Sequence, residues 1–345
     1  MFVRFILFSL IIFLLSGCGS SNPASNPPSD GPTYKQQQAN VEKVTLQLNW
    51  FPEAEHGGFY AAKVHGFFEA EDLEVEIIPG GPNVPVIPTL DTGRVDFAVT
   101  NADRIIFGQA AEADVVALMA PIQDSPRCIM VHDSSGIKSL EELSNVTLAI
   151  GTGPAFFDYM KLKLPLENVE TTAYPGSIGP FLANERFAQQ AYVFSEPFLA
   201  KEQGGAPISL MVSELGYNPY ASLLVARRET ITNSAELTQK LVRASVRGWM
   251  KYLESPEETN KLIASLNPDM SMAALAYGAD EIAKLCKTAN GSFDDLGTMT
   301  TARWQMLIDQ LVEIGRIDEG EIIAKKVFST DFLIFDSPAG SVTTE

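Results

Sequence analysis

The sequence predicts an α/β protein with mixed, mostly parallel sheets flanked by helices and with a helical C-terminal part. Two observations lead to this fold class. Between residues 44 and 211, short apolar runs typical of strands alternate with runs of helical periodicity, and the run 115–119 (Val-Val-Ala-Leu-Met) is apolar on both faces, as in a buried parallel sheet. Between residues 233 and 314, apolar residues recur at helical spacing, which predicts helices at 233–254, 256–266, 271–288 and 300–314.

The first part of the alternating region predicts four strands separated by helices or turns. Leu46 and Leu48 alternate with Gln47 and Asn49, as in a strand with one buried face, and a periodic apolar run at 59–67 predicts the next helix. We also expect a strand at 74–78, a turn at 80–83, a short helix ending at Thr92, a strand at 95–99, a helix at 101–112 and a strand at 115–120.

The second part repeats this pattern. Strands are expected at 127–131, 146–150, 169–173, 191–194 and 222–226, and helices at 155–163, 180–183 and 197–202. A capping box that begins at Ser139 predicts a further short helix. The turn Gly151-Thr152-Gly153-Pro154 follows a strand and precedes a helix, so its free backbone N–H groups can bind an anion or a carbonyl. It lacks the full G-x-G-x-x-G spacing and indicates no nucleotide fold.

The N-terminal residues predict export. Residues 1–17 carry one positive charge, Arg4, and then an uncharged, mostly apolar run, which predicts a signal peptide; the alternative, a plain membrane anchor, needs a longer run. Leu15-Ser16-Gly17-Cys18 resembles the lipobox of bacterial lipoproteins, which implies that Cys18 becomes lipidated. Residues 18–40 are almost free of apolar side chains and predict a flexible tether, and residues 336–345 are expected to fray.

The composition limits the classes of molecule that the protein is expected to bind. The chain has 25 Lys and Arg against 43 Asp and Glu, a formal net charge of −18, which argues against nucleic acids and anionic lipid head groups. Cys128 and Cys286 can pair in an oxidising compartment, and the sequence leaves their pairing open. No Cys-x-x-Cys, His-Glu-x-x-His or EF-hand pattern occurs, so we expect no metal and no cofactor.

Several motifs carry a family resemblance. They are Asn49-Trp50-Phe51-Pro52, His56-Gly57-Gly58-Phe59-Tyr60, Lys63, Gly66-Phe67-Phe68, Pro79-Gly80-Gly81, Gly93-Arg94-Val95-Asp96-Phe97 and Ser195-Glu196-Pro197-Phe198. The sequence resembles the solute-binding proteins related to fungal thiamine-pyrimidine synthases, which belong with the sulfonate, taurine and nitrate binders of ABC importers. The resemblance covers residues 44–230, and the helical tail more loosely. It implies a two-lobe, periplasmic-binding-protein-like fold of type II, with lobe 1 at 41–128 plus 222–335 and lobe 2 at 129–221, in a monomer.

Candidate ligand-binding residues follow strand ends, because ligands of open α/β sheets bind there. Trp50 and Phe51, beside Asn49, suit a flat heteroaromatic ligand; the alternative is that they pack against the following helix. Asn101 follows another strand and can bind a ring or cap a helix. Of the three histidines, His56 opens a helix on the pocket side and is the ligand candidate, whereas His65 suits a helix end.

The second lobe contributes three more candidates. Thr152 lies in the turn described above. Tyr174 ends a strand, where its ring can close over a ligand or pack in the core. Glu196 starts a helix, where its carboxylate can accept two hydrogen bonds from an aminopyrimidine or serve only as a cap.

These features together predict a lipid-anchored binding protein without catalytic activity, held on the outer face of a membrane. The resemblance further implies that it captures a pyrimidine precursor of thiamine by closure of its lobes and delivers it to an ABC permease and ATPase. Riboflavin-like heterocycles are the nearest alternative; sulfonate and nitrate would need Arg or Lys at the turn 151–154, which has neither. An enzyme like the fungal relatives is a further alternative, but their Cys-rich iron-binding segment is absent here. A sensor that only signals to a membrane partner also stays open.

Overall fold

The computed structural model describes residues 41–287 and 292–334. The expected signal peptide, Cys18, the tether and the tail at 336–345 therefore lie outside the described residues. Within those two ranges, none of the helices combines the length and the apolar character needed to cross a membrane.

The first sheet has the strand order β2-β1-β3-β10-β4. Strands β1 and β2 pair in parallel, as do β1 and β3, whereas β10 runs antiparallel between β3 and β4. The bounds are Glu42–Gln47 for β1, Leu73–Ile78 for β2, Phe97–Thr100 for β3, Val115–Met119 for β4 and Leu223–Arg227 for β10. One strand of this sheet thus comes from a distant part of the chain.

The second sheet repeats the same plan with the order β7-β6-β8-β5-β9. Here β6 pairs in parallel with β7 and β8, and β5 runs antiparallel between β8 and β9. The bounds are Arg127–His132 for β5, Thr147–Ile150 for β6, Glu170–Ala173 for β7, Phe187–Tyr192 for β8 and Pro207–Met211 for β9. The expectation of mixed sheets is confirmed, but parallel and antiparallel pairs are equally frequent rather than mostly parallel.

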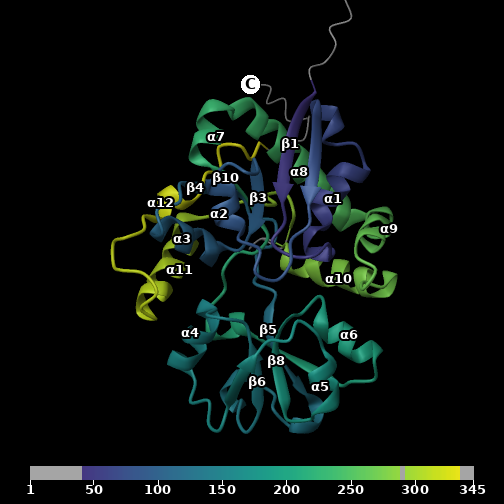
Figure 1. The fold of residues 1–345 in the computed structure, drawn as a ribbon, viewed down its shortest axis with the longest axis vertical. Helices are drawn as coiled ribbons and strands as arrows, with labels where there is room; N and C mark the ends of the chain where they lie inside the picture. The colour runs from purple at the N-terminus through teal and green to yellow at the C-terminus, as the bar shows by residue number, and fades with distance from the viewer. Residues whose placement is uncertain (1–40, 288–291, 335–345) are drawn as a thin grey trace, which may run out of the picture. The chain divides into compact units, whose positions relative to one another are not determined.

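Helices cover both faces of the first sheet (Figure 1). One face packs against α1 (Gly57–Val64), α8 (Ala235–Glu254), α9 (Glu257–Leu266) and α10 (Met272–Leu285). The other packs against α2 (Val86–Asp91), α3 (Ala102–Ala110), α11 (Thr301–Glu313) and α12 (Ala324–Val327). Helix α7 (Arg228–Asn233) follows β10 directly. We call this sheet with its helices the first lobe.

The second sheet carries α4 (Ala155–Lys163) on one face and α5 (Gly179–Ala183) and α6 (Glu196–Glu202) on the other. We call this sheet with its helices the second lobe. Short 3-10 turns complete the described chain at Ala54–His56, Glu69–Glu71, Asp133–Ser135, Leu140–Glu142 and Val212–Leu215. The chain passes to the second sheet after β4 and returns with β10, and we propose the lobe boundaries near these two crossings.

Helices α1 and α8 cross at backbone contact. A Cβ atom on Gly248 of α8 would lie 2.7 Å from the Cβ of Ala62 and would collide with the carbonyl oxygen of Gly58 in α1. Gly58 in turn leaves room for the Trp249 ring, which is completely buried. This close packing fixes the start of α1, and with it the loop between β1 and α1 that carries several site residues.

Some local details differ from the expectations or add to them. Strand β8 spans 187–192 rather than 191–194, and β9, α7 and α12 were not expected. The capping box at Ser139 does not form, because the Ser139 side chain makes no capping hydrogen bond and only a 3-10 turn follows. Cys128 and Cys286 are both buried free thiols, on β5 and at the end of α10, so the open question of a disulfide is answered for this structure.

Candidate functional site

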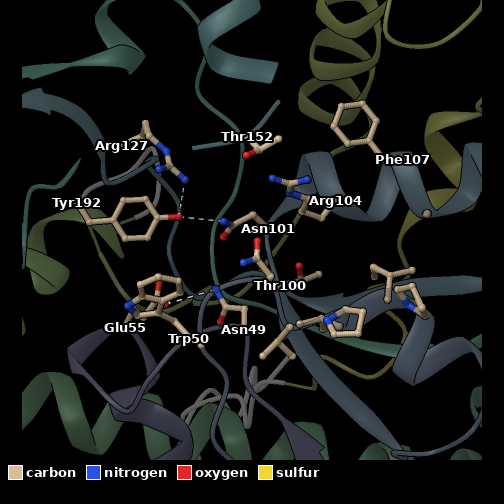
Figure 2. A pocket seen from close by; sticks show the side chains of 18 of the residues that line it. Asn49, Trp50, Glu55, Thr100, Asn101, Arg104, Phe107, Arg127, Thr152 and Tyr192 are labelled. Carbon is tan, nitrogen blue, oxygen red and sulfur yellow. Dashed lines mark hydrogen bonds between the residues drawn. The ribbon is translucent and has the colours of Figure 1, made fainter. Parts of the chain in front are cut away.

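A cavity of about 830 Å³ is lined by residues of both lobes (Figure 2). Its wall consists of residues at the ends of strands of the two sheets, of the loops that follow those strands, of α2 and α3, and of the start of α6. The polar and aromatic residues discussed below are Asn49, Trp50, Glu53, Glu55, Asn101, Arg104, Arg127, Thr152, Tyr174, Gln190, Tyr192, Ser195 and Glu196. A cleft of this size and mixed polarity is typical of a small-molecule site.

Trp50 lies on the cavity wall, whereas Phe51 does not line the cavity and leaves 46% of its surface exposed. The two rings meet edge to face, with centroids 5.5 Å apart. The backbone N–H of Gly80 donates to the Trp50 carbonyl at 2.8 Å, and any side chain at position 80 would collide with the backbone of Leu48 and Trp50. Glycine is therefore required where the turn at 80–83 holds the Trp50 loop.

His56 is completely buried and does not line the cavity. Burial lowers the pKa of its imidazole to about 3, so the ring is neutral at pH 7. Its Nε2 lies 2.9 Å from Oδ1 of Asn49, which can only accept, so we place the single ring proton on Nε2. The Asn49 amide nitrogen then faces Oε1 of Glu55 at 3.4 Å. His56 thus orients Asn49 and has no direct access to a ligand in the cavity.

Two carboxyl groups in the loop between β1 and α1 line the cavity, although the sequence did not single them out. Glu53 is 5% exposed and accepts from the Ser195 hydroxyl at 3.1 Å; Glu55 is 0% exposed and accepts from the Ser222 hydroxyl at 3.2 Å. Burial raises the pKa of Glu55 to about 7. Burial, with the nearby carboxyls of Glu55 and Glu196, raises the pKa of Glu53 well above its usual value. The protonated forms of both carboxyls, which can donate as well as accept hydrogen bonds, therefore persist to higher pH than usual, in the case of Glu55 to near neutral pH.

Glu196 of the second lobe faces the same cavity. Its Oε1 accepts from the Tyr174 hydroxyl at 2.6 Å, and its Oε2 accepts from the backbone N–H of Tyr192 at 2.8 Å. Burial, and then the Glu196 charge, raise the pKa of Tyr174 far above its usual value, so the phenol stays protonated. Ser195, not Glu196, occupies the N-cap position of α6. Glu196 thus belongs to the cavity wall and is fixed by two donors.

Asn101 links the two lobes instead of capping α3. It stands at the N-cap position without a capping side-chain bond; its amide nitrogen donates to the Tyr192 hydroxyl at 2.9 Å, and its Oδ1 accepts from the backbone N–H of Ser222 at 3.2 Å. Arg127 also donates to the Tyr192 hydroxyl, at 3.0 Å, and its guanidinium lies 4.4 Å from the centre of the Tyr192 ring. The Tyr192 hydroxyl therefore accepts twice and keeps its own hydrogen for another acceptor.

The turn at 151–154 reaches the cavity through Thr152. The Gly151 N–H is not free, as it was expected to be, because it donates to Oε1 of Gln190 at 2.9 Å. The Gly153 carbonyl accepts from the Arg316 side chain at 3.2 Å. The turn is therefore held from both sides, and its contribution to the cavity is the Thr152 side chain.

The cavity brings together six of the eight ligand-binding residues expected from the sequence: Asn49, Trp50, Asn101, Thr152, Tyr174 and Glu196. Phe51 and His56 lie outside its lining. Sequence reasoning missed Glu53, Glu55, Arg104, Arg127 and Tyr192. Glu53 and Glu55 could have been found because they share a loop with Trp50. Arg104 could have been found because it follows Asn101, the N-cap of α3, by three residues.

Comparison with known proteins places the chain in a family. A family model described as "NMT1/THI5 like" matches residues 53–259. The riboflavin-binding protein RibY of Chloroflexus aurantiacus is 23% identical over 279 residues, which cover 77% of this chain and 79% of that protein. The formylaminopyrimidine-binding protein of Halalkalibacterium halodurans is 21% identical over 341 residues, which cover 95% of this chain and 98% of that protein.

A solved structure gives the fold independently. The periplasmic aliphatic sulphonate binding protein SsuA from Escherichia coli matches with a TM-score of 0.63 and 16% identity, covering 83% of this chain and 91% of that one. At this identity the likeness supports the fold alone, and the expected periplasmic-binding-protein-like architecture is confirmed. Because the family model matches more than half of the chain, the protein belongs to the NMT1/THI5-like family.

Proposed function

We propose that the protein is the solute-binding component of an ABC importer and captures a pyrimidine precursor of thiamine, such as a formylated aminopyrimidine. The observation that carries this proposal is the presence of an indole, Trp50, and three carboxyl groups, Glu53, Glu55 and Glu196, on the wall of one cavity. An aminopyrimidine offers a flat face for stacking on the indole. Its amino group can donate to a carboxyl oxygen, and its ring nitrogen can accept from a protonated carboxyl.

The arrangement of the lobes supports capture by closure. Hydrogen bonds join the lobes beside the cavity, among them those from Asn101 to Tyr192 and from Ser195 to Glu53. Trp50 and Glu55 belong to the first lobe and Tyr174 and Glu196 to the second, so a ligand between them contacts both. In this proposal, ligand contacts favour the closed state, and closure buries the ligand.

A riboflavin-like heterocycle is the second candidate, because the cavity is large and has apolar as well as polar lining residues. Apolar residues of α2, α3 and the turn before α2 also line it, among them Val84, Pro85, Pro88, Phe107 and Ala111, and a cavity of about 830 Å³ has room for more than a single pyrimidine ring. A larger fused ring system would fill more of this cavity, and one relative of this chain is named for riboflavin.

The importer role includes a lipid anchor on Cys18 and delivery to a permease and ATPase, without chemical conversion of the ligand. Mass spectrometry of the membrane-extracted protein tests the anchor: a lipid-modified N-terminal Cys18 is expected, and a Cys18→Ser variant should leave the membrane fraction. Iron analysis of the purified protein tests the absence of catalysis, since stoichiometric iron would favour an enzyme related to the pyrimidine synthases.

Ligand screening tests the central proposal. We expect the formylated aminopyrimidine to raise the melting temperature and to quench tryptophan fluorescence. Trp50 can report binding directly, because Trp249 and Trp304, the other two tryptophans, are completely buried. Riboflavin, taurine and nitrate form the comparison panel. A response to riboflavin alone would favour the second candidate, and a response only to taurine or nitrate would contradict both.

A further inference from the structure

Arg104 differs from every other charged residue on the cavity wall. Glu53, Glu55, Arg127 and Glu196 each have the hydrogen-bond partners given above, and Asp91 accepts from the backbone N–H of Asp114 at 3.1 Å. The Arg104 guanidinium has no hydrogen bond, ion pair or ring contact with any residue in the described ranges, although it lines the cavity. Its five N–H groups are free to bind a ligand.

The position of Arg104 is set by α3. Residues 104, 107, 108 and 111 lie three or four apart, so they share one helix face, and all four line the cavity. This face is fixed against α2, because a Cβ atom on Gly108 would lie 2.6 Å from Cγ2 of Ile87. Figure 2 shows the Arg104 guanidinium well apart from Trp50 and Glu55. The Arg104 guanidinium and the Glu55 carboxyl thus occupy different parts of the cavity wall.

A guanidinium binds oxygen acceptors, carbonyl or anionic, and repels ammonium groups. Under the proposed function, carboxyl groups of the cavity wall hold the donor edge of the ring. We propose that the cavity recognises its ligand from two sides, with Arg104 selecting an oxygen acceptor on a substituent of the ring that the carboxyl groups hold. This inference rests on the proposed function and adds to it a specificity-determining residue and the kind of substituent that the ligand carries.

Selection between acylated and free amines follows from this layout. An aminopyrimidine whose side-chain amine is formylated presents a carbonyl oxygen to Arg104. The deformylated compound presents an ammonium group at neutral pH, which the guanidinium repels. A phosphate ester at the same place presents anionic oxygens, and the pyrimidine-dione ring of riboflavin presents two carbonyls. The formylated aminopyrimidine, the phosphate ester and riboflavin therefore all present the oxygen acceptors that Arg104 recognises, and the free amine does not.

Calorimetric titration of four variants tests the inference. The wild type, Arg104→Met, Arg104→Lys and Arg94→Met are titrated with the formylated aminopyrimidine, its deformylated amine, the hydroxymethylpyrimidine phosphate and riboflavin. Arg94→Met is the matched control, because Arg94 is an exposed arginine of the same lobe outside the cavity. A hydrogen bond to a charged group corresponds to about a 10- to 100-fold change in affinity.

We expect Arg104→Met to lose affinity by about 10- to 100-fold for whichever oxygen-bearing compound the wild type binds, and to discriminate less against the amine. Arg104→Lys should fall between, and Arg94→Met should match the wild type. Equal affinity of wild type and Arg104→Met for that compound would overturn the inference while leaving the proposed function intact. A wild type that binds none of the four compounds would overturn both. Tighter binding of the formylated aminopyrimidine would identify a carbonyl as the acceptor, and tighter binding of the phosphate ester would identify a phosphate.

Discussion

The buried Glu55 carboxyl should make the stability of the unliganded protein depend on pH. Its pKa is about 7 in the folded protein against an ordinary 4.5, because the carboxyl is completely buried; the Ser222 hydroxyl, Arg127 and Asn49 offset only part of this effect. The folded state therefore holds a proton that the unfolded state has lost between these two values. At about 1.4 kcal/mol for each pH unit, the free energy of unfolding should fall by roughly 3 kcal/mol from this group.

The sign and the pH window follow from the raised pKa. The contribution of Glu55 is complete below pH 4.5, declines as the pH rises, and is exhausted above about pH 7, where both states are ionised. Glu53, whose pKa is also raised by burial, adds a decline of the same sign. Binding of a ligand that accepts from the protonated carboxyl should be weakened by the same rise in pH.

Urea denaturation at several pH values between 5 and 8 measures this decline. We expect Glu55→Gln to make this decline shallower and to leave the part that Glu53 contributes, because the amide keeps the size and the hydrogen-bonding oxygen of the side chain but cannot ionise. Glu76→Gln serves as the control, because Glu76 is an exposed glutamate on β2 and should leave the wild-type slope unchanged. A Glu55→Gln protein with the full wild-type slope would refute the assignment of the raised pKa to this residue.

Three further substitutions test other parts of the structure. Trp50→Ala should abolish ligand-induced fluorescence quenching while far-ultraviolet circular dichroism stays unchanged; retained affinity would exclude stacking. Glu196→Gln should weaken aminopyrimidine binding by roughly 1–3 kcal/mol in calorimetry, because glutamine keeps only one of the two carboxyl oxygens of Glu196 as an acceptor. Equal affinity would mean that Glu196 has only a structural role. Gly248→Ala should destabilise the fold by about 1–3 kcal/mol or more in urea, because the new methyl group meets the backbone of α1; an unchanged midpoint would mean that the helices can separate without cost.

The order of strands and helices was predictable because it rests on local periodicity. The apolar runs at β4 and β6 and the helical spacing of α8 signal their structures within a few residues. Strand β8 was misplaced for a physical reason: its centre carries Gln189 and Gln190, which break the apolar pattern. Gln189 is nevertheless completely buried, and Gln190 accepts from the Gly151 N–H. Tertiary contacts that no local pattern contains decide such positions.

The site was predictable as far as it follows the rule that ligands bind at the carboxyl ends of parallel strands. Asn49 and Trp50 follow β1, Asn101 follows β3, Thr152 follows β6 and Glu196 follows β8. His56 was misjudged because sequence order shows that it opens a helix but not which way its ring points; the ring is buried against Asn49. Orientation around a helix start depends on the packing of α1 against α8, which lies almost two hundred residues away along the chain.

Some cavity residues were missed because they do not follow the carboxyl end of a parallel strand. They lie at the amino ends of antiparallel strands. In the first sheet β10 runs antiparallel to β3, and in the second sheet β5 runs antiparallel to β8. The amino ends of β10 and β5 therefore lie at the same edge of the sheet as the carboxyl ends of β3 and β8. Arg127, the first residue of β5, pairs with Tyr192 at the end of β8, and Leu223, the first of β10, pairs with Thr100 at the end of β3. Arg127 thereby enters the cavity, and Ser222, just before β10, reaches Glu55. Since these inserted strands are also the ones that connect the lobes, the groups that control the charge of the cavity wall sit beside the crossings. Lobe movement should therefore change the electrostatic environment of Glu55 directly.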